Sequence, residues 1–128
     1  MNIVLLCGNI VKDSELQKTN SGVSYYRNTI AVRKEFKNAN GDYETDFIKF
    51  ICWDKSAEFF SKFVKKGDTL NIRGKLQTIK YEDKNGNKKE ELEVVCDKAE
   101  FLKSAERKEE PIKSNQEEFE VDESQLPF

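Results

Sequence analysis

Along much of the first hundred residues, apolar positions recur every second residue or gather in short β-branched runs, as in strands that bury one face. This pattern predicts five strands, at residues 2–11, 25–36, 42–53, 69–81 and 89–102. Two Asn-Gly pairs, Asn40-Gly41 and Asn85-Gly86, stand between successive stretches and are typical of hairpin turns. We therefore expect two of the strand connections to be hairpins.

One stretch, residues 55–64, follows a different period. Its apolar positions recur at the spacing of one helix face, at Phe59, Phe60, Phe63 and Val64. Asp54 or Ser56 can cap the first turn of this helix, and Gly67 can stop it. The chain thus predicts one helix between the third and fourth strands.

The resulting order, β-β-β-α-β-β, predicts a mainly β fold. It fits the five-stranded oligonucleotide-binding (OB) barrel, which carries one helix between strands 3 and 4. Gly74 stands inside the fourth strand and indicates a bend of the kind that a closing barrel needs. A generic α+β sandwich is the alternative.

Charge is distributed unevenly along the chain. Residues 1–103 carry 19 Lys and Arg against 16 Asp and Glu, and residues 104–128 carry 3 against 8. The apolar period also ends near residue 102. We therefore predict an OB domain at 1–103, a flexible linker at 104–116 and a disordered acidic C-terminal tail at 117–128.

Several classes of site and location are disfavoured by the composition. The three cysteines, Cys7, Cys52 and Cys96, form no C-x-x-C pair and lie in apolar runs, which predicts reduced core residues of an intracellular protein. With no histidine and no Gly-rich phosphate loop, we expect no metal, no cofactor and no catalytic residues, and a binding protein rather than an enzyme. No apolar run reaches the roughly 18 residues of a membrane span, so we expect a cytoplasmic protein with no membrane partner.

The segment TDFIKFICWDK gives the most specific indication of function. Alternate strand residues face opposite sides, so one face carries Ile48, Phe50 and Cys52, and the other carries Phe47, Lys49, Ile51 and Trp53. Bases can stack on Phe47 and Trp53 while Lys49 meets a phosphate, an arrangement that suits single-stranded nucleic acid. The alternative is that the two rings cover a subunit interface.

Two further segments repeat this mixture of aromatic and basic residues. RKEF contains Arg33, Lys34 and Phe36, and QTIKYEDKNGNKK contains Lys80 and Tyr81. A single barrel can bring these segments together, and we expect all five residues to contact nucleic acid. For each hairpin lysine taken alone, a solvated turn is the alternative.

Residues 2–102 resemble the bacterial and phage single-stranded DNA-binding proteins. The resemblance rests on NIVLLCGNIVKDSEL, on TDFIKFICWDKSAE and on FVKKGDTLNIRGKLQTIKYEDKNG. It implies a protein that binds and protects single-stranded DNA with little sequence preference during replication, recombination and repair. It implies stacking by Phe36, Phe47, Trp53 and Tyr81, and phosphate contacts by a set that includes Lys49. Members often carry tryptophan at three of the four ring positions, so stacking here should be somewhat weaker.

The resemblance also implies a role for the acidic tail. Members typically end in an acidic run followed by Ile-Pro-Phe, which docks into basic, hydrophobic pockets on replication, recombination and repair proteins. Leu126, Pro127 and Phe128 resemble that tip, with Asp122 and Glu123 among the acids before it. Two polar residues separate the acids from the apolar end, which departs from the family's pattern.

Members usually form homotetramers, so the resemblance implies a homotetramer, with a dimer as the alternative, associated with the nucleoid through DNA. The residues alone leave two other functions open. One is binding of RNA, because the same barrel and stacking serve RNA. The other is a protein-interaction adaptor whose Phe47 and Trp53 are buried between subunits.

Overall fold

The computed structural model describes residues 1–105. Nearly all of the predicted linker and the whole of the predicted tail, with Asp122, Glu123 and Leu126–Phe128, lie outside the described residues.

Six strands and one α-helix make up the described part of the chain. They are β1 (Val4–Ile10), β2 (Gln17–Lys18), β3 (Ser24–Lys37), β4 (Tyr43–Trp53), α1 (Asp54–Phe63), β5 (Thr69–Glu82) and β6 (Lys88–Lys103). The five predicted strands and the predicted helix are confirmed, with small differences at their ends. The two-residue strand β2 was not predicted, because two residues are too few to show an alternation.

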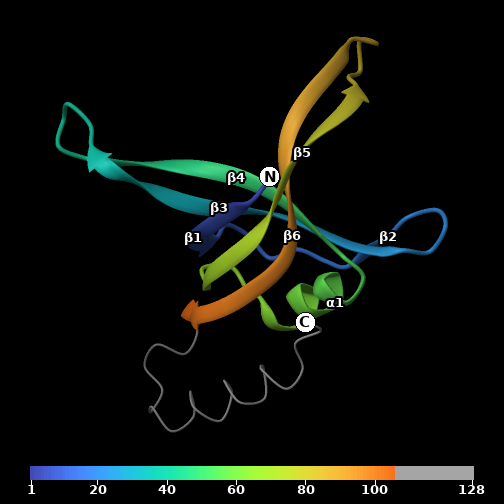
Figure 1. The fold of residues 1–128 in the computed structure, drawn as a ribbon, viewed down its shortest axis with the longest axis horizontal. Coiled ribbons are helices and arrows are strands. Elements are labelled where there is room, and N and C mark those ends of the chain that lie inside the picture. Colours follow the sequence, from blue (N-terminus) through green and yellow to red (C-terminus); the bar gives the residue numbers. More distant parts are fainter. Residues whose placement is uncertain (106–128) are drawn as a thin grey trace, which may run out of the picture.

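Five of the strands close into a barrel (Figure 1). The sheet order is β1-β5-β6-β4-β3-β2, and an additional pairing of β1 with β3 closes the ring. The pairing of β4 with β6 is parallel, and the others are antiparallel. This confirms the prediction of a mainly β, OB-type barrel with one helix.

Helix α1 packs against the barrel through aromatic rings. Phe60 lies 5.4 Å from Tyr26 of β3 and 5.5 Å from Phe50 of β4, measured between ring centroids. Phe59 meets Phe101 of β6 edge to face at 6.1 Å. Tyr26, Phe50 and Phe60 are fully buried, so the helix contributes part of the core against which the strands pack.

The start of α1 differs from the prediction. Trp53 is the N-cap and makes no side-chain capping hydrogen bond, so neither Asp54 nor Ser56 caps the helix. Asp54 is the first helical residue and has a φ of 52°, in the left-handed region that Asp and Asn adopt more readily than most residues. At the other end the helix stops at Phe63, before Gly67.

Gly74 lies where β5 bends, as predicted. The β5–β6 register shifts between Arg73 and Gly74. A Cβ atom at Gly74 would lie 2.1 Å from the carbonyl oxygen of Val95, so no other residue fits without movement of the backbone.

The two Asn-Gly pairs form the predicted turns. Gly41 and Gly86 have positive φ, at 83° and 80°. Each turn is held by the carboxyl or amide oxygen of its first residue, Asn38 or Asp83, which accepts two backbone N–H bonds. The hairpins β3–β4 and β5–β6 extend from the barrel as two long arms (Figure 1).

The cysteine prediction is correct for two of the three residues. Cys52 and Cys96 are buried and free, whereas Cys7 is free but exposed on β1. The prediction for Cys7 was wrong because β1 is apolar on both faces, with Leu5 also exposed, so an apolar run there does not mark the core.

Residues 1–105 include no cluster of His, Cys, Asp and Glu side chains that could hold a metal ion. Nor does any helix in this part of the chain have the length and apolar character of a membrane span.

Candidate nucleic-acid interface

The side of β3, β4, β6 and β5 that faces away from the core carries most of the predicted contact residues, and we call it the outer face. On β4, Phe50 and Cys52 point into the core, so the residues at the alternate positions point outward. Phe47 is 66% exposed and Trp53 is 37% exposed. Lys49 stands between them with a largely exposed side chain. The predicted ring, cation, ring order is therefore present on one strand face.

Ile51 does not belong to the open part of this face, contrary to the prediction. It is 1% exposed, although it points to the same side as Lys49 and Trp53. Its cross-strand partner is Arg27 of β3, whose Nε lies 3.0 Å from Oε2 of Glu93 on β6. Since β4 lies between β3 and β6, this ion pair passes over β4 beside Ile51 and accounts for its burial.

Strand β3 adds two residues to the outer face that the sequence analysis missed. Tyr25 is the cross-strand partner of Trp53, and their ring centroids lie 5.7 Å apart. The guanidinium of Arg27 lies 5.7 Å from the centroid of the Tyr25 ring. Counting the antiparallel register outward from the turn would have placed Arg27 opposite Trp53, because the β3–β4 register shifts between Arg33 and Lys37.

The arm formed by β3 and β4 carries three of the predicted residues. Arg33 lies on the outer face, with its guanidinium 4.4 Å from the ring centroid of Tyr43. Lys34, the next residue, faces the other side and bonds Asp46 at 2.7 Å, which raises the pKa of its ammonium group. Phe36 is strongly exposed and lies where the β3–β4 register shifts.

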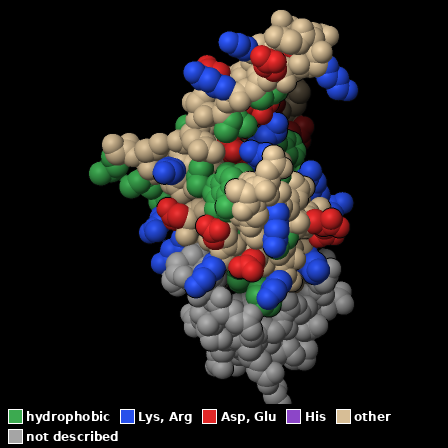
Figure 2. Space-filling view, turned by 90° about the vertical axis from the view of Figure 1, so that its right-hand side faces the viewer, with side chains coloured by type: hydrophobic (Ala, Val, Ile, Leu, Met, Phe, Trp, Pro, Cys, Tyr) green, Lys and Arg blue, Asp and Glu red, His purple; other side chains and the backbone are tan. Residues whose placement is uncertain are grey.

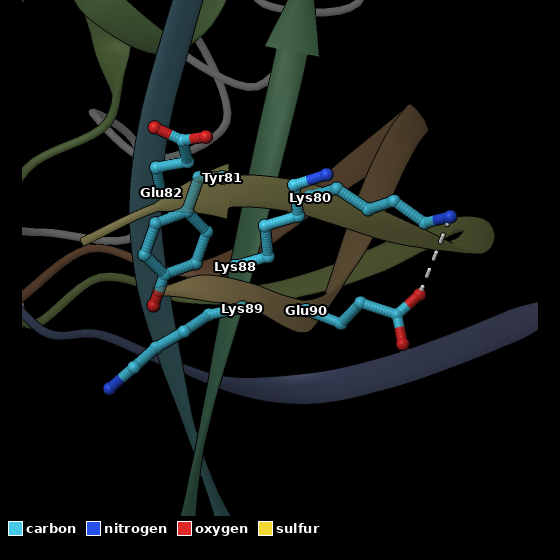
Figure 3. A pocket seen from close by; sticks show the side chains of 6 residues that line it. All are labelled: Lys80, Tyr81, Glu82, Lys88, Lys89 and Glu90. Atoms are coloured by element: carbon cyan, nitrogen blue, oxygen red, sulfur yellow. Dashed lines mark ion pairs between the residues drawn. The ribbon is translucent and has the colours of Figure 1, made fainter. Parts of the chain in front are cut away.

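On the β5–β6 arm, Tyr81 and Lys80 leave β5 in different directions (Figure 3). Lys80 lies 4.0 Å from Glu90, measured between Nζ and Oε1. Tyr81 instead donates its hydroxyl to Oε1 of Glu91 at 3.0 Å. Because neighbouring strand residues face opposite sides, only Tyr81 joins the outer face. Figure 2 shows that the projecting arm carries both basic and acidic side chains.

Glu91 links the arm to the centre of the outer face. Its Oε2 lies 3.4 Å from Nζ of Lys49, so its carboxylate has one partner on β5 and another on β4. The hydroxyl of Tyr81 and the ammonium of Lys49 hold the pKa of Glu91 below its usual range. In turn, the bond to Glu91 raises the pKa of the Tyr81 phenol.

A groove of ≈ 630 Å³ is lined in part by Phe47 and Lys49 of β4. Its other lining residues are Val4, Leu6, Ile48, Leu76, Glu91, Leu92, Glu93 and Val94. A mainly apolar lining with a few charged groups can receive flat rings, and phosphates can remain in solvent.

The eight predicted contact residues do not all lie on the outer face. Arg33, Phe47, Lys49, Trp53 and Tyr81 share the outer face, and Phe36 lies at the shifted end of β3. Lys34 and Lys80 face the other side. Their role in contacting nucleic acid stays a prediction.

Comparison with known proteins gives matches over the whole barrel. The sequence profile of the Single-strand binding protein family matches residues 1–102. The chain is 40% identical over 104 residues to the Single-stranded DNA-binding protein 3 of Listeria innocua serovar 6a, covering 81% of this chain and 65% of that protein. It is 41% identical over 102 residues to the Single-stranded DNA-binding protein 1 of Staphylococcus aureus strain MSSA476, covering 80% and 65%.

A third relative, the Single-stranded DNA-binding protein of Enterococcus faecalis, is 39% identical over 104 residues, covering 81% of this chain and 55% of that protein. The chain thus spans less than two thirds of the length of the relatives that it matches. The family match covers the complete barrel and every residue of the outer face described above. The chain therefore belongs to the Single-strand binding protein family.

Proposed function

We propose that the outer face binds single-stranded DNA with little sequence preference. The observation that carries this proposal is the row on β4, where Lys49 stands between the exposed rings of Phe47 and Trp53. Each ring can stack on a base of any kind, which contributes about 1 to 3 kcal/mol per base. In this proposal Lys49 meets the phosphate between the two stacked bases. The names of the three relatives support DNA as the ligand.

The proposed path of the strand follows the outer face from the β3–β4 arm to the β5–β6 arm. Arg33 and Phe36 lie at one end of this path and Tyr81 at the other. Lys34 and Lys80 are not part of it, because their side chains face away from the outer face. As a member of a family of DNA-binding proteins without catalytic activity, the chain is not an enzyme. We propose that it protects single strands during replication, recombination and repair, in the cytoplasm and on the nucleoid.

The proposed assembly is a homotetramer. Support comes from Leu5 of β1 and the preceding Ile3, which are exposed apolar side chains, and such surfaces mark contacts between subunits more often than free solvent faces. Sedimentation equilibrium of the purified chain tests the assembly, since a dimer or monomer mass contradicts it.

We further propose that residues 117–128 recruit partner proteins through Leu126, Pro127 and Phe128, with Asp122 and Glu123 steering the approach. Because these acids also repel DNA, removing residues 117–128 should tighten DNA binding at low salt and abolish capture of replication proteins. Capture that survives the truncation contradicts the recruitment role.

Titration of the only tryptophan, Trp53, tests DNA binding directly. Oligo-dT, oligo-U and duplex DNA are added separately at two salt concentrations while the Trp53 fluorescence is followed. We expect strong quenching by oligo-dT, weaker quenching at higher salt, and little effect of the duplex. Tighter binding of oligo-U identifies RNA as the ligand. No response to any of the three, with unchanged mobility of labelled oligo-dT on a gel, favours the adaptor function.

A further inference from the structure

Two acidic residues of β6 pair with two cations of the outer face, and the two ion pairs differ in burial. Glu93 is only 4% exposed and bonds Nε of Arg27 at 3.0 Å, with a second hydrogen bond from Gln77 at 3.3 Å. Glu91 is 36% exposed, and its partner Lys49 is 61% exposed. The same strand thus carries one buried and one open carboxylate, two residues apart.

This difference decides which cation can leave its partner when DNA arrives. If Arg27 turned to a phosphate, the buried carboxylate of Glu93 would lose its charged partner, which is strongly unfavourable. Arg27 therefore stays with Glu93. Exposed ion pairs such as that of Lys49 contribute little free energy, about 0 to 1 kcal/mol, so Lys49 can be released at small cost.

Glu91 also keeps a hydrogen bond after Lys49 leaves. Its second oxygen, Oε1, accepts the hydroxyl of Tyr81 at 3.0 Å. The titratable groups around it are Lys49 on β4, Tyr81 on β5 and Lys89 on its own strand. The low pKa of Glu91 means that the carboxylate is charged at neutral pH, where it attracts Lys49 and repels a phosphate.

We propose that Lys49 exchanges between Glu91 and a DNA phosphate, so that Glu91 is a built-in competitor that lowers the affinity of the outer face for single strands. This inference rests on the proposed function. Glu91 contacts two residues that we propose to bind DNA, Lys49 and Tyr81. The competition acts through Lys49, because it carries the charge. A face of this kind holds DNA less tightly than its cations alone would, and it releases the strand more readily.

The chain offers a matched control. Glu91→Gln removes one negative charge from the outer face and retains an oxygen that can accept the Tyr81 hydroxyl. Glu90→Gln removes the same charge from the neighbouring residue, which pairs with Lys80 on the other side of the arm. Glu90 is exposed and Glu91 is partly exposed, so both variants should keep the wild-type melting temperature.

The experiment measures the affinity of full-length wild type and both variants for labelled oligo-dT by fluorescence anisotropy at low and high salt. We expect Glu91→Gln to bind about three- to tenfold more tightly at low salt, with the difference shrinking as salt screens the charges. Glu90→Gln should change the affinity by less than about twofold. In a Lys49→Ala background, the gain from Glu91→Gln should largely disappear.

Three results would overturn the inference while leaving DNA binding intact. The first is equal or weaker binding by Glu91→Gln, which makes Glu91 a positioning residue for Lys49 and Tyr81. The second is an equal gain in affinity in Glu90→Gln, which would mean that the effect arises from net charge alone. The third is a gain that persists without Lys49. Failure of wild type to bind oligo-dT is a separate result that overturns the proposed function itself.

Discussion

Trp53 of β4 and Tyr25 of β3 stand directly opposite each other in the antiparallel register, with ring centroids 5.7 Å apart and ring planes inclined by 45°. The Tyr25 hydroxyl donates to Oε1 of Gln17 on β2 at 2.7 Å, which fixes the ring from its far side. Trp53 therefore presents only part of its surface to solvent, and the two rings form one aromatic unit at the end of the outer face.

The first prediction is that Tyr25 contributes to DNA binding through this unit. Tyr25→Ala should weaken oligo-dT binding by about 1 kcal/mol or more. In the protein without DNA it should also shift the fluorescence emission of Trp53 to longer wavelength, because the Tyr25 ring no longer covers the indole. Tyr25→Phe keeps the ring and loses the bond to Gln17, so most of the affinity should remain. Equal losses in both variants would show that the hydroxyl, and not the ring, is what matters.

Phe47 gives the second prediction. Its side chain is 66% exposed in the middle of the outer face, so Phe47→Ala should weaken oligo-dT binding by about 1 to 3 kcal/mol with little change in melting temperature. Leu102→Ala is the control, because Leu102 is also exposed but lies at the opposite end of β6 from the arm. Titration of both variants beside wild type makes the comparison. A loss of similar size in the control would mean that the assigned face is wrong.

The sequence was sufficient for the features that depend on local pattern. The period of two placed Phe47, Lys49 and Trp53 on one face of β4, and the two Asn-Gly pairs marked their turns correctly. These features follow from the geometry of a single strand or of four turn residues.

Features that depend on neighbouring strands could not be obtained in this way. Ile51 is covered by an ion pair between β3 and β6, which come to lie on either side of β4 only when the sheet forms. Cys7 lies on a strand that is apolar on both sides. By contrast, the sequence alone could have shown that Lys80 and Tyr81 face opposite sides, because adjacent strand residues cannot share a face.

The third prediction concerns the closure of the barrel at Gly74. A methyl group there would meet the backbone oxygen of Val95 at 2.1 Å, and backbone cannot rotate aside as a side chain can. Gly74→Ala should lower the free energy of unfolding by about 2 kcal/mol or more, measured by urea denaturation. Lys75→Ala, at the exposed neighbouring position, should change it by less than about 0.5 kcal/mol. An unchanged urea midpoint for Gly74→Ala would contradict the tight approach of β5 to β6.

The fourth prediction is a loss of stability at alkaline pH that arises from Tyr26. Burial in the core raises the pKa of its phenol to about 12, against an opposing hydrogen bond from Asn28. In the unfolded chain the phenol ionises near its ordinary pKa of about 10. The neutral phenol is therefore fully compatible with folding below about pH 10. Between about pH 10 and pH 12 only the unfolded state releases the proton, so the stability falls as pH rises.

Urea denaturation of wild type and Tyr26→Phe from about pH 8 to about pH 12 measures this effect. Tyr26→Phe should start less stable by about 1 kcal/mol, because Asn28 loses a hydrogen-bond partner. Above about pH 10 the stability of wild type should fall by about 1 to 3 kcal/mol relative to that of Tyr26→Phe, so that the gap closes or reverses, because only wild type carries this titrating phenol. Tyr43→Phe is the control for loss of an exposed tyrosine, and its curve should run parallel to that of wild type. If the Tyr26→Phe curve also stays parallel through this range, then the Tyr26 phenol ionises equally easily in both states and its burial does not govern alkaline unfolding.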